Sequence, residues 1–147
     1  MKLPLTNTIS LDSIMKVPKS IPAYQRDFVW EDGLIESYIS SLYEAFERQD
    51  EYFTGSMVFY ESGDTYEIVD GQQRITVVFC IIGEILKYLG ISQINDYKVT
   101  AASQRDNYIY KSNLRKLGEK RFLLTHRNNE IRKCLEDIGM GENIHKE

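Results

Sequence analysis

Residues 66–86 read YEIVDGQQRITVVFCIIGEIL and carry the strongest structural signal in the chain. The alternating residues Thr65–Val69 predict a strand, and the apolar run Ile75–Leu89 predicts a helix that is buried on most of its circumference. Between them lie five polar or glycine residues, Asp70-Gly71-Gln72-Gln73-Arg74, which we call the hinge. A simple turn does not require an acid, two amides and an arginine, so the hinge is the first candidate site.

The hinge has the composition of an anion-binding site. A helix N-terminus offers free N–H groups and partial positive charge, and a glycine such as Gly71 lets a ligand approach the backbone. Arg74 supplies a planar set of donors that matches phosphate oxygens, and Gln72 and Gln73 can orient a water or a ligand. Asp70 can contact Mg²⁺ or accept a proton from an attacking water. These residue types predict a phosphate site capable of hydrolysis.

A purely structural interpretation of the hinge stays open beside the first. In that interpretation Asp70 caps the helix, Gly71 makes a turn, and Arg74 pairs with Asp70 or with a surface acid. The P-loop pattern of many nucleotide-binding proteins is absent from the sequence. Spacing alone does not separate the two interpretations.

The residues before the hinge predict a helix and a hairpin. Apolar side chains recur every three or four residues after Asp32, a good N-cap, so we expect an amphipathic helix at about 33–49. Aromatic and β-branched residues predict a strand at Tyr52–Tyr60, joined by the loop Glu61–Asp64 to the return strand. Residues 1–12 predict a short strand and turn, and the prolines of Ser13–Pro22 predict an extended segment or loop.

The pattern is weaker after the hinge helix, which we expect to stop at Gly90. We expect helix within 103–117, a short strand at Arg121–Thr125, and a last helix at roughly 130–138, capped by Asn128 or Asn129. The order of elements predicts one small α+β (α/β-like) domain over residues 1–147. Its core lies at about 10–90, with a mixed sheet and a β-hairpin, and a mainly helical extension covers about 91–147.

Two further polar clusters are candidates for the same site. Tyr24, Gln25 and Arg26 lie in a proline-marked loop just before a helix, flanked by the aromatic residues Phe28 and Trp30. An arginine among aromatic rings suits a cation–π contact or base stacking, although Phe28 and Trp30 also suit core anchors. In the second cluster, Gly55 and Ser56 interrupt a predicted strand, which often marks close approach of a ligand or another backbone segment.

Charge is distributed unevenly along the chain, whose net charge is −4. Residues 1–97 carry 7 Lys/Arg against 15 Asp/Glu, whereas residues 98–133 carry 10 against 3, a net of +7. The total argues against non-specific binding of nucleic acid by the whole surface. The basic segment is either a solvated helical face or a patch for phosphate or for an acidic partner.

The two cysteines and the apolar runs indicate a protein of a reducing compartment. Cys80 and Cys134 show neither a disulfide framework nor zinc spacing, and Cys80 reads as a small buried hydrophobe. No apolar run approaches the length of a membrane span, and the N-terminus does not resemble a signal peptide. We therefore expect a cytoplasmic protein.

Three motifs in this order resemble a known family. IPAYQRDFVW, YFTGSMVFY and YEIVDGQQRIT together resemble the N-terminal domain of GmrSD-type, modification-dependent restriction enzymes, which is similar in plan to ParB and sulfiredoxin. The specific motifs cover roughly residues 10–90. The stretch KRFLLTHRNNEIRKCL extends the resemblance more loosely to about residue 138, as the closing strand and helix.

The resemblance implies a nucleoside-triphosphate-binding module, often an NTPase, that regulates DNA cleavage in anti-phage defence. The hinge would then be the nucleotide-hydrolysis motif, with Mg²⁺ as its expected cofactor. Tyr24, Gln25 and Arg26 would contact phosphate or a modified DNA backbone, and Gly55 and Ser56 would line the pocket floor. A non-enzymatic module that senses nucleotide or binds DNA phosphate is the alternative.

One departure from the family pattern concerns the nuclease. Such enzymes usually continue into a His-Asn-His-type nuclease domain, but this chain contains only His126 and His145. We interpret His126 as a structural or surface residue and expect the nuclease in cis or in trans. The chain is then either a detached regulatory domain or a fragment of a longer protein. Sulfiredoxin-like phosphoryl transfer is disfavoured because the hinge contains no cysteine.

Overall fold

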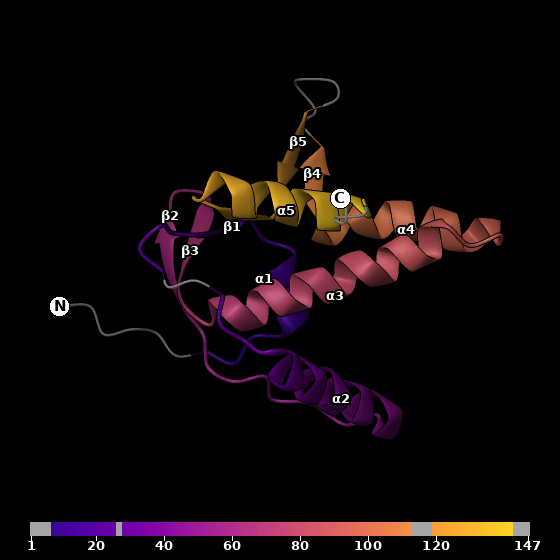
Figure 1. Ribbon diagram of the computed structural model, residues 1–147, viewed down its shortest axis with the longest axis horizontal. Coiled ribbons are helices and arrows are strands. Elements are labelled where there is room, and N and C mark those ends of the chain that lie inside the picture. Colours follow the sequence, from indigo (N-terminus) through magenta and orange to yellow (C-terminus); the bar gives the residue numbers. More distant parts are fainter. Residues whose placement is uncertain (1–6, 26–27, 113–118, 143–147) are drawn as a thin grey trace.

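A mixed four-stranded sheet forms one side of the molecule (Figure 1). The computed structural model describes residues 7–25, 28–112 and 119–142. The strand order is β2-β3-β1-β6, in which β1 pairs in parallel with β3 and β6, whereas β2 and β3 form an antiparallel hairpin. Their bounds are β1 Lys19–Ile21, β2 Val58–Ser62, β3 Thr65–Asp70 and β6 Leu124–His126.

Helices and a second hairpin complete the described part of the chain. The long helix α3 runs from the sheet and contacts both α4 and α5 (Figure 1). This mixture confirms the α+β class, with the buried helix after the hinge and a mainly helical C-terminal part. The bounds are α1 Leu11–Met15, α2 Asp32–Arg48, α3 Gln72–Gly90, α4 Asn95–Tyr108, β4 Tyr110–Ser112, β5 Lys120–Phe122 and α5 Asn129–Met140.

The core lies where α3 meets the sheet and α5. Ile75, Val78 and Phe79 of α3 are buried at helical spacing, as the apolar run predicted. They pack with Ile68 of β3 and with residues of the other elements, namely Met15, Ile21, Ile109, Leu124 and Leu135. None of the described helices combines the length and apolar character needed to cross a membrane.

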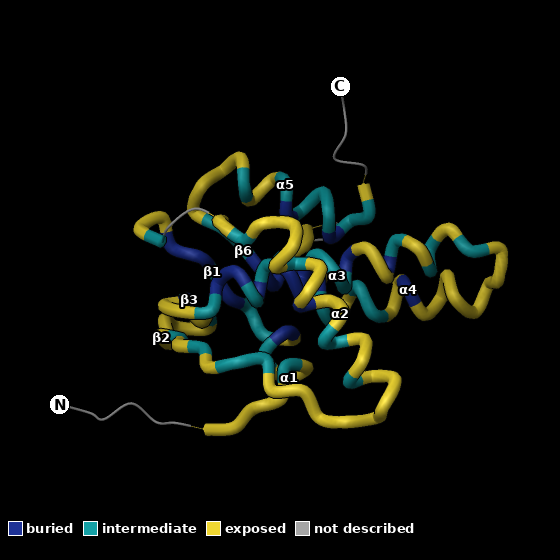
Figure 2. Tube along the Cα trace, turned by 60° about the horizontal axis from the view of Figure 1, so that its bottom comes forward, coloured by how far each residue is buried: buried dark blue, intermediate teal, exposed yellow. Residues whose placement is uncertain are grey.

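Helix α2 confirms the amphipathic prediction in its bounds but packs less than its sequence suggests. Only Tyr38 is buried, through edge-to-face contacts with Trp30 and Tyr52. Tyr43 and Phe46 on the apolar side are exposed, and most of α2 is coloured as exposed or intermediate in Figure 2. The expected cap at Asp32 is wrong, since the N-cap position is Glu31 and no side chain caps the helix there.

Some other predicted boundaries are wrong. The strand and turn expected over residues 1–12 fall partly on residues 1–6, outside the described residues, and the rest of that range leads through the Ser10 cap into α1. The segment expected to be extended contains β1, although its first residues belong to α1. The second strand begins only at Val58, because Gly55 adopts a φ of 107° that a strand does not allow. The helix expected within 103–117 starts earlier, at Asn95, and ends at Tyr108.

The end of the chain was predicted better. The expected strand Arg121–Thr125 is two short strands, β5 and β6, separated by buried Leu123, whose N–H donates to Ile109 O. Asn128 caps α5 by accepting hydrogen bonds from the N–H groups of Glu130 and Ile131, as predicted. Helix α3 includes Gly90, and the helix cap falls at Ile91 instead.

Lys19 is a buried lysine in the central strand. Its side chain is 1% exposed, and Nζ donates to the carbonyl oxygens of Val17 at 2.8 Å and Met15 at 3.1 Å. A longer contact of 3.4 Å reaches the oxygen of Leu123. Burial lowers the pKa of this ammonium group to about 7, because removal from water disfavours the charged form.

This pKa predicts how stability varies with pH. In the unfolded chain a lysine has a pKa of about 10.4, so between about pH 7 and 10 the unfolded state binds more protons than the folded state. The contribution of Lys19 to the free energy of unfolding should therefore rise with pH across this range, by at most about 1.4 kcal/mol per unit, and be lost as the pH falls from about 10 to about 7. Urea unfolding of wild type and Lys19→Met across this range measures it. A difference that stays constant with pH would contradict the lowered pKa.

Candidate functional site

The hinge lies at the carboxyl end of the parallel strands. Strands β1, β3 and β6 run in the same direction and end at Ile21, Asp70 and His126. Ligands of sheets with parallel strands commonly bind beyond these ends, where loops and helix N-termini converge. The loop with Tyr24 and Gln25, the hinge, and Arg127 all follow these strand ends.

Gly71 makes the turn from β3 into α3. Its φ of 93° is unfavourable for other residues, and a Cβ atom there would lie 2.7 Å from Met57 Cγ. Asp70 Oδ1 accepts a hydrogen bond of 2.9 Å from the N–H of Gly71. Within the described part of the chain no side chain caps the N-terminus of α3 by a hydrogen bond, and the Asp70 carboxylate stabilises the turn. The Asp70 carboxylate therefore lies on the N–H of the N-cap residue, and among the described residues no side-chain cap is made to the N–H groups of the first turn, where the helix dipole is positive.

Gln72 and Gln73 point inward. They are 8% and 5% exposed and line a small pocket of about 40 Å³ together with Phe28, Thr76 and His126. We call it the glutamine pocket. Gln73 Oε1 accepts a hydrogen bond of 3.1 Å from the N–H of Val29, while its buried Nε2 has no hydrogen-bond partner among the described residues. The pocket has room for a water molecule but not for a nucleotide.

Arg74 connects the hinge to the segment before β2. Its Nη1 donates to the carbonyl oxygen of Ser56 at 2.7 Å. The guanidinium group lies against Gly55, where an added Cβ atom would be 2.6 Å from Nη1 and 2.8 Å from Cζ. No carboxylate of the described residues forms an ion pair with Arg74, so the pairing with Asp70 or a surface acid is not observed. Two of the three predicted clusters thus meet in the structure.

The loop after β1 brings in the third cluster. Gln25 Nε2 donates to the carbonyl oxygens of Ile68 at 3.1 Å and Val69 at 2.8 Å, which fastens the loop to the end of β3. The Tyr24 hydroxyl donates to Glu67 Oε1 at 3.0 Å, and this carboxylate raises the pKa of the hydroxyl. Arg26 lies outside the described residues. Tyr24 and Gln25 therefore position the loop beside the hinge.

The aromatic residues of this loop divide between the two expected roles. Trp30 packs against the core and meets the Tyr38 ring edge-on at 5.4 Å, which confirms it as an anchor. Phe28 is 45% exposed and lines the glutamine pocket. Tyr38 also shares a 2.5 Å hydrogen bond with Thr54 Oγ1, next to Gly55. The anchor thus supports the segment on which Arg74 rests.

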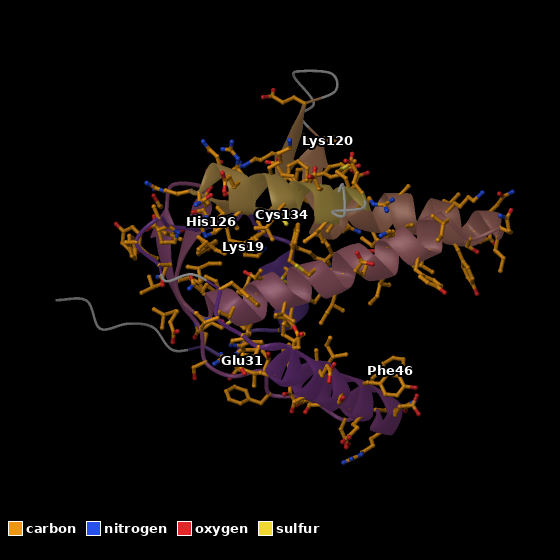
Figure 3. The ribbon with its side chains drawn as sticks, viewed as in Figure 1. Lys19, Glu31, Phe46, Lys120, His126 and Cys134 are labelled. Atoms are coloured by element: carbon orange, nitrogen blue, oxygen red, sulfur yellow. The ribbon has the colours of Figure 1, made fainter. Side chains whose placement is uncertain are left out.

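His126 and Arg127 are neighbours of the hinge that the sequence did not assign to it. His126 ends β6, lines the glutamine pocket, and accepts a hydrogen bond of 2.9 Å at Nδ1 from the N–H of Asn128 (Figure 3). An accepting Nδ1 places the ring proton of neutral His126 on Nε2. Arg127 Nη2 lies 3.7 Å from Oε2 of Glu67, the carboxylate that also accepts from Tyr24. The available sequence signal was their place directly after the closing strand.

Magnesium fits this site only as a partner of bound phosphate. No group of three or more His, Cys, Asp or Glu residues in the described chain is arranged to hold a metal ion. Asp70 offers one carboxylate, of which Oδ1 already accepts from Gly71. Mg²⁺ in phosphate-transfer sites is commonly held by one or two carboxylates, substrate phosphates and water, so one carboxylate is compatible with it.

Cysteine chemistry does not fit the site. Cys80 and Cys134 are free cysteines and both are partly buried, in α3 and α5. Burial raises the pKa of the Cys80 thiol to about 11, so it is not a thiolate at neutral pH.

Fold and site together define a small α+β domain whose polar residues gather beyond the carboxyl ends of parallel strands. The sequence model of the GmrSD restriction endonuclease N-terminal domain matches residues 8–146, and the chain belongs to this family. The match confirms the resemblance and gives the chain a role in a restriction system. Among curated proteins, none matches the sequence.

Proposed function

We propose that the chain binds a nucleoside triphosphate at the hinge and hydrolyses it. The observation that carries this proposal is the N-terminus of α3, which has no side-chain cap among the described residues and beside which Arg74 donates to the carbonyl oxygen of Ser56. The N–H groups and dipole of a helix N-terminus favour phosphate, and a positioned guanidinium group can neutralise charge that develops on a transferred phosphoryl group.

The residues of the hinge would have separate roles in binding the phosphates, orienting the water and contacting Mg²⁺. Gly71 allows the phosphate to approach the backbone, and Arg74 donates hydrogen bonds to its oxygens. Gln72 and Gln73 would orient the attacking water, for which the unpaired Nε2 of Gln73 is a buried donor. Asp70 would contact Mg²⁺, which supplies additional positive charge at the phosphates. Gln25 holds the neighbouring loop in place, and Arg26 is expected to contact phosphate from it.

Membership of a restriction family suggests what the hydrolysis serves. We propose that nucleotide binding and turnover regulate DNA cleavage by a His-Asn-His-type nuclease domain, in cis or in trans, within an anti-phage restriction system. The DNA it acts on would carry a modification, as the resemblance implies for this family. The cleavage itself belongs to the partner domain.

A non-enzymatic nucleotide sensor is the second candidate. Its support is the tightness of the hinge, where Asp70 and Gln25 already make internal hydrogen bonds and the glutamine pocket holds about 40 Å³. Such a module would bind nucleotide as a switch without turning it over. Binding without phosphate release would favour this candidate.

The test is phosphate release by the purified chain with Mg²⁺ and each of the four common nucleoside triphosphates, with and without DNA. We expect release that Arg74→Ala abolishes, because this variant removes the positioned charge while leaving the core intact. Arg48→Ala is the matched control, since Arg48 is exposed at the far end of α2 and pairs only with Glu44 in the described chain.

The outcomes separate the two candidates. Release lost in Arg74→Ala and kept in Arg48→Ala supports hydrolysis at the hinge. No release, but nucleotide binding by calorimetry that depends on Arg74, supports the sensor. Normal release by folded Arg74→Ala would refute the assignment of the site.

A further inference from the structure

A second and larger pocket lies at the opposite end of the parallel strands. Its volume is about 260 Å³, and it is lined where β1 and β3 begin, by β5, and by the outer side of α5. Three exposed cations, Lys120, Arg121 and Arg132, line it with one acid, Glu136, and with the buried Lys19, whose ammonium group is bonded to carbonyl oxygens. Lys120 begins β5 opposite Ser112, at the loop end of the β4–β5 hairpin, and is labelled above α5 in Figure 3. We call it the basic pocket.

Arg121 is fixed in the basic pocket by its partners. Nη1 and Nη2 donate to the two oxygens of Asp64 at 2.7 and 3.0 Å, and Nη2 also donates to Thr65 Oγ1 at 2.8 Å. The guanidinium group holds the pKa of Asp64 below its usual range, so this acid stays ionised. These contacts use three of the five N–H groups, and the remaining donors are held in a defined orientation.

The other two cations have weaker partners. Arg132 Nε is 3.8 Å from Glu136 Oε1, which is too far for a hydrogen bond, and the Arg132 side chain is 48% exposed. Lys120 Nζ lies 4.5 Å from the centroid of the Tyr110 ring and 3.8 Å from Met140 Sδ. Within the described residues no carboxylate pairs with Lys120. The pocket therefore keeps positive charge that an added anion can neutralise.

The size of the basic pocket limits what that anion is. Pockets for drug-sized ligands usually hold about 300–1,000 Å³, so about 260 Å³ suits one phosphate group with part of its sugar better than a whole nucleotide. Arginine pairs and hydroxyl groups such as Thr125 are common partners of backbone phosphates. The basic segment 98–133, with its net charge of +7, contributes all three cations.

We propose that the basic pocket binds a phosphodiester group of DNA. The inference follows from the three cations and the pocket size, and from membership of a family of restriction enzymes. It does not depend on hydrolysis at the hinge. The two ends of the parallel strands then bind different ligands: nucleotide binds at the carboxyl ends and the DNA backbone binds at the amino ends.

The test compares two double variants by fluorescence anisotropy with a labelled duplex. Lys120→Gln with Arg132→Gln removes two cations of the basic pocket and leaves the Arg121–Asp64 pair. Lys16→Gln with Arg48→Gln removes two exposed cations, one at the end of α1 and one in α2, and is the matched control. We expect the pocket variant to lower the slope of log K against log salt by about one and the control to leave it unchanged.

Several results would overturn the proposal. The first is an equal salt slope for the two double variants, and the second is no measurable binding of duplex by the wild type. The third is that inorganic phosphate binds in the basic pocket while duplex DNA does not bind at all. The last result would show a site for a free anion. Urea unfolding of each variant checks the fold, and phosphate release without DNA should be equal in wild type and the pocket variant. A failure of the proposed hydrolysis is thereby distinguished from a failure of the proposed DNA binding.

Discussion

Phe79→Ala is expected to lower the free energy of unfolding by about 3–5 kcal/mol. The Phe79 side chain is completely buried in the middle of α3 and belongs to the core that joins this helix to the sheet and α5. Removal of the ring forfeits its burial and leaves a cavity that rigid neighbours fill only in part. Since small domains are stable by about 5–15 kcal/mol, urea unfolding should show a large shift of the midpoint.

Phe53→Ala is the control for the same chemical change on the surface. Phe53 is 81% exposed, so its truncation should alter the free energy of unfolding by less than about 0.5 kcal/mol. Similar losses in the two variants would contradict the placement of α3 in the core. The comparison is independent of any function of the hinge.

Gly55→Ala is expected to lower phosphate release by a factor on the order of a hundred, the usual effect of losing one positioned donor. The new Cβ atom would lie 2.6 Å from Arg74 Nη1, so the guanidinium group has to move and lose its bond to Ser56. Because the atoms displaced are the end of a flexible side chain, the fold should survive with a modest loss of about 1–3 kcal/mol from the φ of 107°. This expectation rests on the proposed hydrolysis.

Gly63→Ala separates backbone strain from the displacement of Arg74. Gly63 also has a positive φ, of 64°, but nothing lies within 4 Å of a Cβ atom added there. The Gly63→Ala variant should be less stable than wild type but release phosphate at the wild-type rate. If Gly55→Ala released phosphate as fast as Gly63→Ala, the position of Arg74 against Gly55 would have no part in turnover.

The periodic parts of the fold were predictable from sequence. The spacing of apolar residues located α2, and the switch from alternation to an apolar run located β3 and α3. The start of α4 was missed because its sequence is polar and no side chain caps it. The strand predicted from Tyr52 begins at Val58, since propensity does not register that Gly55 takes a left-handed conformation.

The site was predictable in its members but not in its contacts. The sequence identified Gly71 and Arg74, yet only the structure shows that Arg74 rests on Gly55 and Ser56. It also shows that Gln73 is buried and holds Val29. His126 was missed because it comes near the hinge only through the pairing of β6 with β1, which no local pattern reveals.

The central position of β1 has a consequence for the newly made chain. Its two neighbours in the sheet pair with it at residues far apart, since Lys19 lies opposite Tyr66 on one side and Leu124 on the other. A ribosome makes roughly a hundred further residues before the second neighbour exists, and until then β1 presents an unpaired edge. The sheet is therefore completed late in synthesis. Until then, the unpaired side of β1 is where two nascent chains can pair with one another.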